Sequence, residues 1–160
     1  DNYFSRVAPH AKQRVLQAYP EYPRRSALVA IGSDAMFGGP TWAFADAYSE
    51  HAPTQMYRFD HFGISLRMLG LGATHGSEIV HIQHSYSSYL GRKLHPLGRR
   101  VQPSVGRRMQ RTWLDFATDG LSEWPRFDTR DRQTRVIRST RDVTVADPDA
   151  VRREAWAGVY

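Results

Sequence analysis

One of the seven histidines stands in surroundings that suit proton transfer. His75 lies in the stretch Ala73-Thr74-His75-Gly76, where small neighbours leave its imidazole ring accessible. An imidazole with an ordinary pKa of about 6.5 can accept a proton from a hydroxyl group and return it to a leaving alcohol at neutral pH. The sequence therefore offers His75 as a candidate catalytic base, and the alternative is a histidine packed within a loop.

The residues that would complete such a site are not recognisable in the chain. There is no cysteine to act as a nucleophile. A serine nucleophile commonly stands in Gly-x-Ser-x-Gly, because the glycines permit the sharp turn that exposes its hydroxyl. Ser33 and Ser77 each adjoin only one glycine. A complete catalytic triad therefore cannot be assembled from these 160 residues.

Metal binding is the other chemistry that histidines suggest. Glu78, His81 and His84 have helical spacing, and Glu-x-x-His is half of a di-iron ligand set. The chain has no second Glu-x-x-His and no His-Glu-x-x-His zinc motif. We therefore expect no metal site and treat the histidines outside the His75 stretch as ordinary surface residues.

Composition favours a globular chain without a membrane or nucleic-acid partner. The net charge is +6 and 41% of the residues are hydrophobic, but no apolar stretch approaches the length of a membrane span. The basic residues are spread along the chain with acids between them, as on a solvated surface. Arginine supplies almost all of the positive charge, a bias typical of GC-rich bacterial genes. No signal peptide opens the chain, and localisation stays open because the first residue, Asp1, is not a start methionine.

Periodicity and turn residues predict a mixed order of elements. Helices are expected over 7–19, from Pro40 to 48, after Ser77, over 105–119 and after Asp147. Strands are expected over 54–62, 132–139 and 142–146. Residues 26–31 fit either a helix or a short buried strand, Gly38-Gly39-Pro40 is expected to break the chain, and 63–72 and 91–103 are expected to be loops.

The clearest predicted helix is the one over 105–119. Val105, Met109, Trp113 and Phe116 form one apolar stripe, and Gly120 follows as a typical stop signal. We expect Trp113, Phe116 and Trp124 to belong to the core.

Several stretches of the sequence resemble motifs of one protein family, and they follow one another in the same order as in that family. They are "AYP", "SDAMFGGP", "MYRFDH", "GATHGSEI", "MQRTWLDFATDG", "EWPRFD" and "VADPDAVRREAW". Over nearly its whole length, the sequence resembles the C-terminal third of a type B carboxylesterase, an α/β-hydrolase family that includes para-nitrobenzyl esterases, liver carboxylesterases and cholinesterases. "GATHGSEI" is similar to the family's Ala-x-His-Gly-x-Glu segment around the catalytic histidine. The resemblance implies that His75 is the triad histidine.

The same resemblance explains why the nucleophile is missing. In an α/β-hydrolase the triad follows the chain order serine, acid, histidine, so a C-terminal piece holds only the histidine. The resemblance implies an α/β fold class in which residues 1–160 form the last strands of the central sheet with their covering helices. It implies a serine carboxylesterase that acts on an ester without a cofactor. The partner of this chain is then the N-terminal part of the same fold, and the chain alone is expected to be inactive.

The resemblance also suggests a substrate pocket beside His75. Loops next to the histidine form the mouth of the gorge in this family, which makes pocket candidates of Phe37, Phe59, Phe62, Met68 and Leu69. For each of these residues, packing in the core is an equally good alternative. Glu78 follows His75 by three residues, and at that spacing along a helix its carboxylate is poorly placed to orient the His75 ring. We therefore expect Glu78 to form a structural hydrogen bond or to provide a negative charge at the start of a helix. Two other functions stay open: a non-catalytic, cholinesterase-like adhesion protein, and a small basic nucleic-acid-binding domain.

Overall fold

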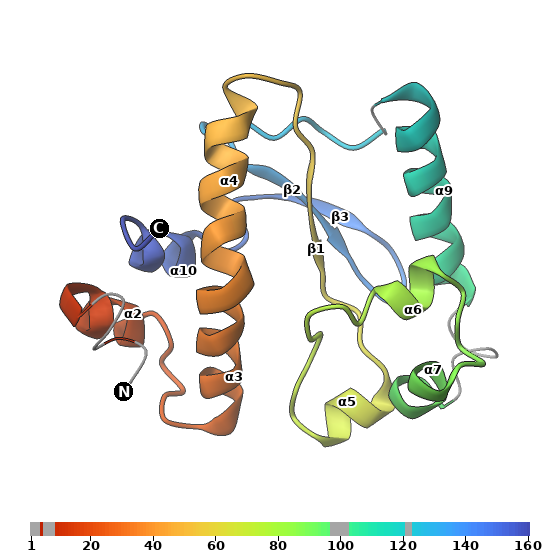
Figure 1. Cartoon of the computed structure of the whole chain (residues 1–160), viewed down its shortest axis with the longest axis horizontal. Helices are drawn as coiled ribbons and strands as arrows, with labels where there is room; N and C mark the ends of the chain where they lie inside the picture. The colour runs from red at the N-terminus through yellow and green to blue at the C-terminus, as the bar shows by residue number, and fades with distance from the viewer. Residues whose placement is uncertain (1–3, 5–8, 97–102, 121–122) are drawn as a thin grey trace.

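The computed structural model describes residues 4, 9–96, 103–120 and 123–160. A small sheet lies between the long rod formed by α3 and α4 on one side and α9 on the other (Figure 1). The elements in chain order are η1 (Pro9–Ala11), α2 (Lys12–Gln17), α3 (Arg25–Ser33), η2 (Asp34–Gly38), α4 (Gly39–Ser49), β1 (Met56–Phe59), α5 (Ile64–Met68), α6 (Ile79–Ile82), α7 (Tyr89–Leu94), α9 (Pro103–Asp119), β2 (Gln133–Ile137), β3 (Val143–Ala146) and α10 (Ala150–Trp156).

The sheet has three strands in the order β1, β2, β3. β1 pairs with β2 in parallel, with Met56 opposite Thr134, and β2 pairs with β3 antiparallel, with Gln133 opposite Ala146. A parallel pair needs a long crossover, and here the segment from α5 to α9 supplies it. The three predicted strands are confirmed, although the structure makes each of them shorter at its ends.

α3 and α4 form one continuous rod, so the expected chain break at Gly38-Gly39-Pro40 is wrong. The π-helical turn η2 joins the two helices, and Pro40 falls in the first turn of α4, where its missing N–H costs little. The two glycines serve close packing. A Cβ on Gly38 would lie 2.6 Å from Asp34 Oδ1, and one on Gly39 would lie 2.1 Å from Tyr160 Cε2. The rod also settles residues 26–31 as helical.

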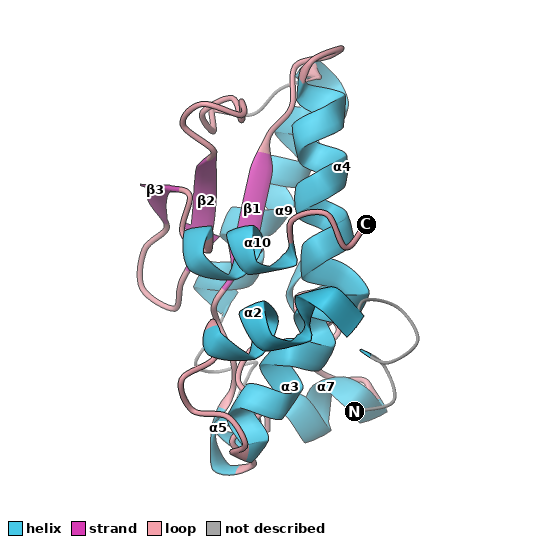
Figure 2. Cartoon of the chain, turned by 90° about the vertical axis from the view of Figure 1, so that its left-hand side faces the viewer, coloured by secondary structure: helices cyan, strands magenta, loops and turns pink. Residues whose placement is uncertain are grey.

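Two apolar clusters hold the molecule together. The larger joins α2, α3 and α10, with Val15 and Trp156 fully buried. α10 packs on both α2 and α4 (Figure 2). The smaller cluster places Val105 and Met109 of α9 against Ile137 of β2. Burying side chains of this size stabilises the fold by roughly 1.5–3 kcal/mol each.

α9 confirms the helix predicted over 105–119, and Gly120 follows it with φ 79°. Only the first half of the predicted stripe is buried, however. Phe116 is 50% exposed, so its assignment to the core is wrong. The end of α9 runs past the sheet, and Phe116 lines an open hollow there with Tyr57, Trp113 and Trp124. Trp113 and Trp124 are half-buried rather than enclosed.

Several helix boundaries also differ from the prediction. The helix expected over 7–19 is confirmed over Lys12–Gln17, and residues 5–8 lie outside the described part of the chain. The prediction of a loop over 91–103 is wrong at its start, since α7 extends to Leu94. Ser88 caps this helix by accepting a hydrogen bond from the Gly91 N–H. Residues 97–102 are not described.

The two predicted capping residues do not cap their helices. α6 begins after Glu78, and Ser77 makes no side-chain cap there. α10 begins after Asp149, because Asp147 adopts φ 40° and binds the Arg153 side chain instead. Within the described residues, no helix combines the length and the apolar character that a bilayer crossing needs.

Candidate functional site

His75 lies on the loop that connects α5 to α6. Gly70, Gly72 and Gly76 take φ values of 65°, 67° and 75°, which turn this loop at positions that other residues adopt only with strain. The His75 side chain is exposed, and its ring stacks on Phe37 of η2 with a centroid distance of 3.7 Å and an interplanar angle of 6°. The π-helical turn thus provides a flat support for the imidazole.

An open pocket of ≈ 400 Å³ adjoins this stacked pair. Its walls come from η2 and α4, from β1, from the His75 loop and from the start of α10. Phe37 and Phe59, two of the pocket candidates, are among the residues that line it. The candidates Phe62, Met68 and Leu69 are not among the residues that line this pocket, and Met68, at the end of α5, is 82% exposed.

The floor of the pocket is a chain of ion pairs. Arg152 binds Asp34 at 3.0 Å and also binds Asp149, while Arg58 binds Asp149 at 2.8 Å. The Tyr19 hydroxyl donates to Asp34 at 2.6 Å. Burial raises the pKa of Asp34, and Arg152 opposes that rise. These acids are therefore held by arginine and tyrosine.

Neither Asp34 nor Glu78 forms a hydrogen bond to the His75 ring. Among residues 4, 9–96, 103–120 and 123–160, no side chain forms a hydrogen bond to it. Glu78 occupies the N-cap position of α6, as expected for a helix-start charge, but its side chain makes no hydrogen bond there. It lies near Tyr57, whose pKa is raised to about 12 by burial and then by the Glu78 charge.

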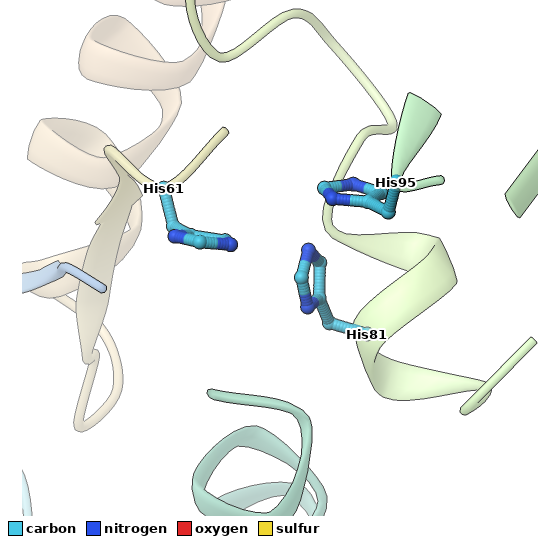
Figure 3. Close-up of side chains that lie close together, drawn as sticks. All are labelled: His61, His81 and His95. Carbon is cyan, nitrogen blue, oxygen red and sulfur yellow. The ribbon is translucent and has the colours of Figure 1, made fainter. Parts of the chain in front are cut away.

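Three other histidines meet in the interior, which corrects their treatment as surface residues. His61, His81 and His95 are 3%, 0% and 2% exposed. One ring nitrogen from each lies within 4.8 Å of the others. Figure 3 shows the rings converging from the end of β1, from α6 and from the end of α7. Such a set suits a metal ion, since neutral imidazole is a common ligand.

Two of these rings are held by hydroxyl groups. His61 Nδ1 lies 2.8 Å from Ser139 Oγ, and His81 Nδ1 lies 2.8 Å from Tyr86 Oη. Burial, followed by the neighbouring His95 and His61, lowers the pKa of His81 to about 3. Sequence motifs could not find this group, because its members come from three elements with no short spacing between them.

Comparison with solved structures places the architecture among α/β-hydrolases. A thermophilic PNB esterase superposes with a TM-score of 0.76 and 22% identity over 91% of this chain and 30% of that one. A Geobacillus stearothermophilus carboxylesterase gives a TM-score of 0.70 and 22% identity over 90% of this chain and 31% of that one. Another PNB esterase gives 0.69 and 22% identity, covering 94% and 30%. This chain thus spans about a third of these structures or less, and the expected α/β fold class is confirmed.

Sequence comparison identifies the family. The family model described as the carboxylesterase family matches residues 5–153, so the chain belongs to that family. No match was found among the curated proteins.

Proposed function

We propose that His75 is the proton-transferring histidine of a serine carboxylesterase, and that this chain forms the C-terminal portion of that enzyme. The observation that carries the proposal is the position of its ring. In a chain of the carboxylesterase family, His75 is exposed on a glycine-rich loop, stacked on Phe37 beside a pocket of ≈ 400 Å³. An accessible and oriented imidazole is what a general base requires.

The proposed reaction is hydrolysis of a carboxylic ester in two steps. His75 accepts the proton of a serine hydroxyl as that oxygen attacks the ester carbonyl, and then gives the proton to the departing alcohol, which leaves an acyl-serine. In the second step His75 accepts a proton from water as the water attacks the acyl group. It returns that proton to the serine when the carboxylic acid leaves. No cofactor enters this sequence.

In this proposal, the upstream portion of the fold supplies the serine, the acid that orients His75 and the donors that stabilise the oxyanion. The apolar pocket wall formed by Phe37, Met56 and Phe59 suits the hydrocarbon part of an ester. Met68 and Leu69 are exposed, and with the half-buried Phe62 they are proposed to complete the pocket mouth against that upstream portion.

The test is a His75→Ala substitution in the protein that contains both this chain and the upstream Gly-x-Ser-x-Gly segment. We expect kcat for p-nitrophenyl acetate to fall by about 10²- to 10⁴-fold, because general acid–base catalysis is lost. His84→Ala is the matched control, since His84 is also an exposed histidine but lies outside the pocket. Unchanged turnover in His75→Ala contradicts the proposal, and a reading frame without the serine favours the non-catalytic adhesion role.

A further inference from the structure

We propose that His61, His81 and His95 form a zinc-binding site that is separate from the His75 pocket. The three side chains are almost completely buried, and the candidate ligand atoms lie within 4.8 Å of one another. In a tetrahedral site with Zn–N bonds of about 2.05 Å, ligand nitrogens are about 3.3 Å apart. The rings therefore need to approach one another by about 1.5 Å or less, which small side-chain rotations provide.

The chemistry of the donor set selects zinc. The site offers imidazole nitrogens alone, and zinc takes imidazole readily while calcium and magnesium prefer oxygen ligands. Three histidines and one water molecule complete a tetrahedral zinc shell.

Hydroxyl groups behind the rings support the same assignment. Metal-binding histidines usually donate their second ring nitrogen to a fixed partner, which orients the ring. Tyr86 Oη lies 2.8 Å from His81 Nδ1, and Ser139 Oγ lies 2.8 Å from His61 Nδ1. This leaves Nε2 of His81 as its ligand atom, and that nitrogen is buried without a hydrogen-bond partner among the described residues. A buried polar atom in that condition costs free energy that a metal bond recovers.

The site would join three separate segments of the chain. His61 follows β1, His81 belongs to α6 and His95 ends α7. The His95 ring packs tightly on Gly63, where a Cβ would lie 2.8 Å from His95 Nδ1. A zinc ion here would join the chain before α5 to α6, so both ends of the segment formed by α5 and the His75 loop would be fixed.

The experiment measures zinc bound to the full chain after removal of metals with a chelator. We expect one zinc ion per chain by elemental analysis and calorimetric titration, and a melting temperature that rises with zinc concentration. His81→Gln and His95→Gln should each abolish the bound zinc. His51→Asn is the matched control: His51 is an exposed histidine that follows α4 and lies outside the cluster, so the amount of zinc bound per chain should not change in this variant.

Tyr86→Phe keeps the aromatic ring and removes only its hydroxyl. It should weaken zinc binding about 10- to 100-fold, as the loss of a supporting hydrogen bond does at other metal sites. This variant keeps the proposal testable if a glutamine variant does not fold. The proposal is overturned if the chelated chain binds no zinc, if binding survives His81→Gln and His95→Gln, or if Tyr86→Phe binds as tightly as the parent. None of these measurements depends on esterase activity.

Discussion

At the residue scale, the environment of His75 explains how a surface histidine is held in one orientation. Its ring is exposed but lies flat on Phe37, and the ion pairs of Asp34, Asp149 and Arg152 lie deeper in the pocket. The sequence could identify His75 from its small neighbours and from the family-like segment. It could not identify Phe37 as a supporting ring, because that contact depends on the π-helical turn. The sequence could not identify the cluster of His61, His81 and His95 either, because it forms only when three separate segments pack together.

Removing the supporting ring should reduce activity without unfolding the protein. Phe37→Leu leaves an apolar side chain but no flat surface, so we expect kcat in the serine-containing protein to fall about 2- to 10-fold, the equivalent of one aromatic contact of 0.5–1.5 kcal/mol. Phe44→Leu is the matched control, since Phe44 is 67% exposed on α4 and stacks on Tyr48 instead. Equal turnover in both variants would rule out the supporting role.

At the element scale, the sequence correctly predicted the helices and strands whose own residue pattern is enough to define them. α9 has its apolar stripe and its terminal glycine, and β2 and β3 have short β-branched runs. The prediction from sequence was wrong where contacts between elements determine the local structure. Gly38-Gly39-Pro40 looked like a break, yet the glycines admit Asp34 and Tyr160 at close range and the helix continues through them. The first residues of the loop expected over 91–103 are instead helical and belong to α7, where Gly91 packs on the backbone of Ser85.

Two helical glycines should respond to alanine in opposite directions. A Cβ on Gly91 would lie 2.2 Å from the Ser85 carbonyl oxygen, so Gly91→Ala must displace backbone and should lower the free energy of unfolding by about 1–3 kcal/mol. A Cβ on Gly32 of α3 meets nothing within 4 Å, so Gly32→Ala should raise it by about 0.5–1 kcal/mol. Urea unfolding of both variants measures these changes. A stabilised Gly91→Ala variant would contradict the packing of α7.

At the scale of the whole molecule, the chain resembles a portion of a larger hydrolase. Within the part of the chain that the structure describes, β1 pairs with β2 on one side only, and Phe116 and the nearby tryptophans line an aromatic hollow beside β1. The family match spans residues 5–153, while the similar esterase structures are about three times longer than this chain. The family resemblance predicts that such a chain lacks the serine and the acid, because the triad of an α/β-hydrolase follows the chain order serine, acid, histidine.

The 160-residue chain alone should therefore not hydrolyse p-nitrophenyl acetate above background. Exposed histidines can catalyse a slow reaction in solution, so the comparison is with His75→Ala of the same chain. We expect both proteins to give the same rate, linear in protein concentration and without saturation by ester. A saturable rate that disappears in His75→Ala would show that the chain contains its own nucleophile.

The π-helical turn η2 has a consequence for how the pocket can vary. Such a turn holds one residue more than the α-helical turn that it replaces. A chain shortened by one residue between Asp34 and Gly38 could form a regular helix while the flanking faces, with Ile31 on one side and Trp42 on the other, still turn toward the interior. The side chain presented to His75 would change although the interior would not. Length variation at this point therefore changes the side chain that lines the pocket next to His75, while Ile31 and Trp42 keep their positions.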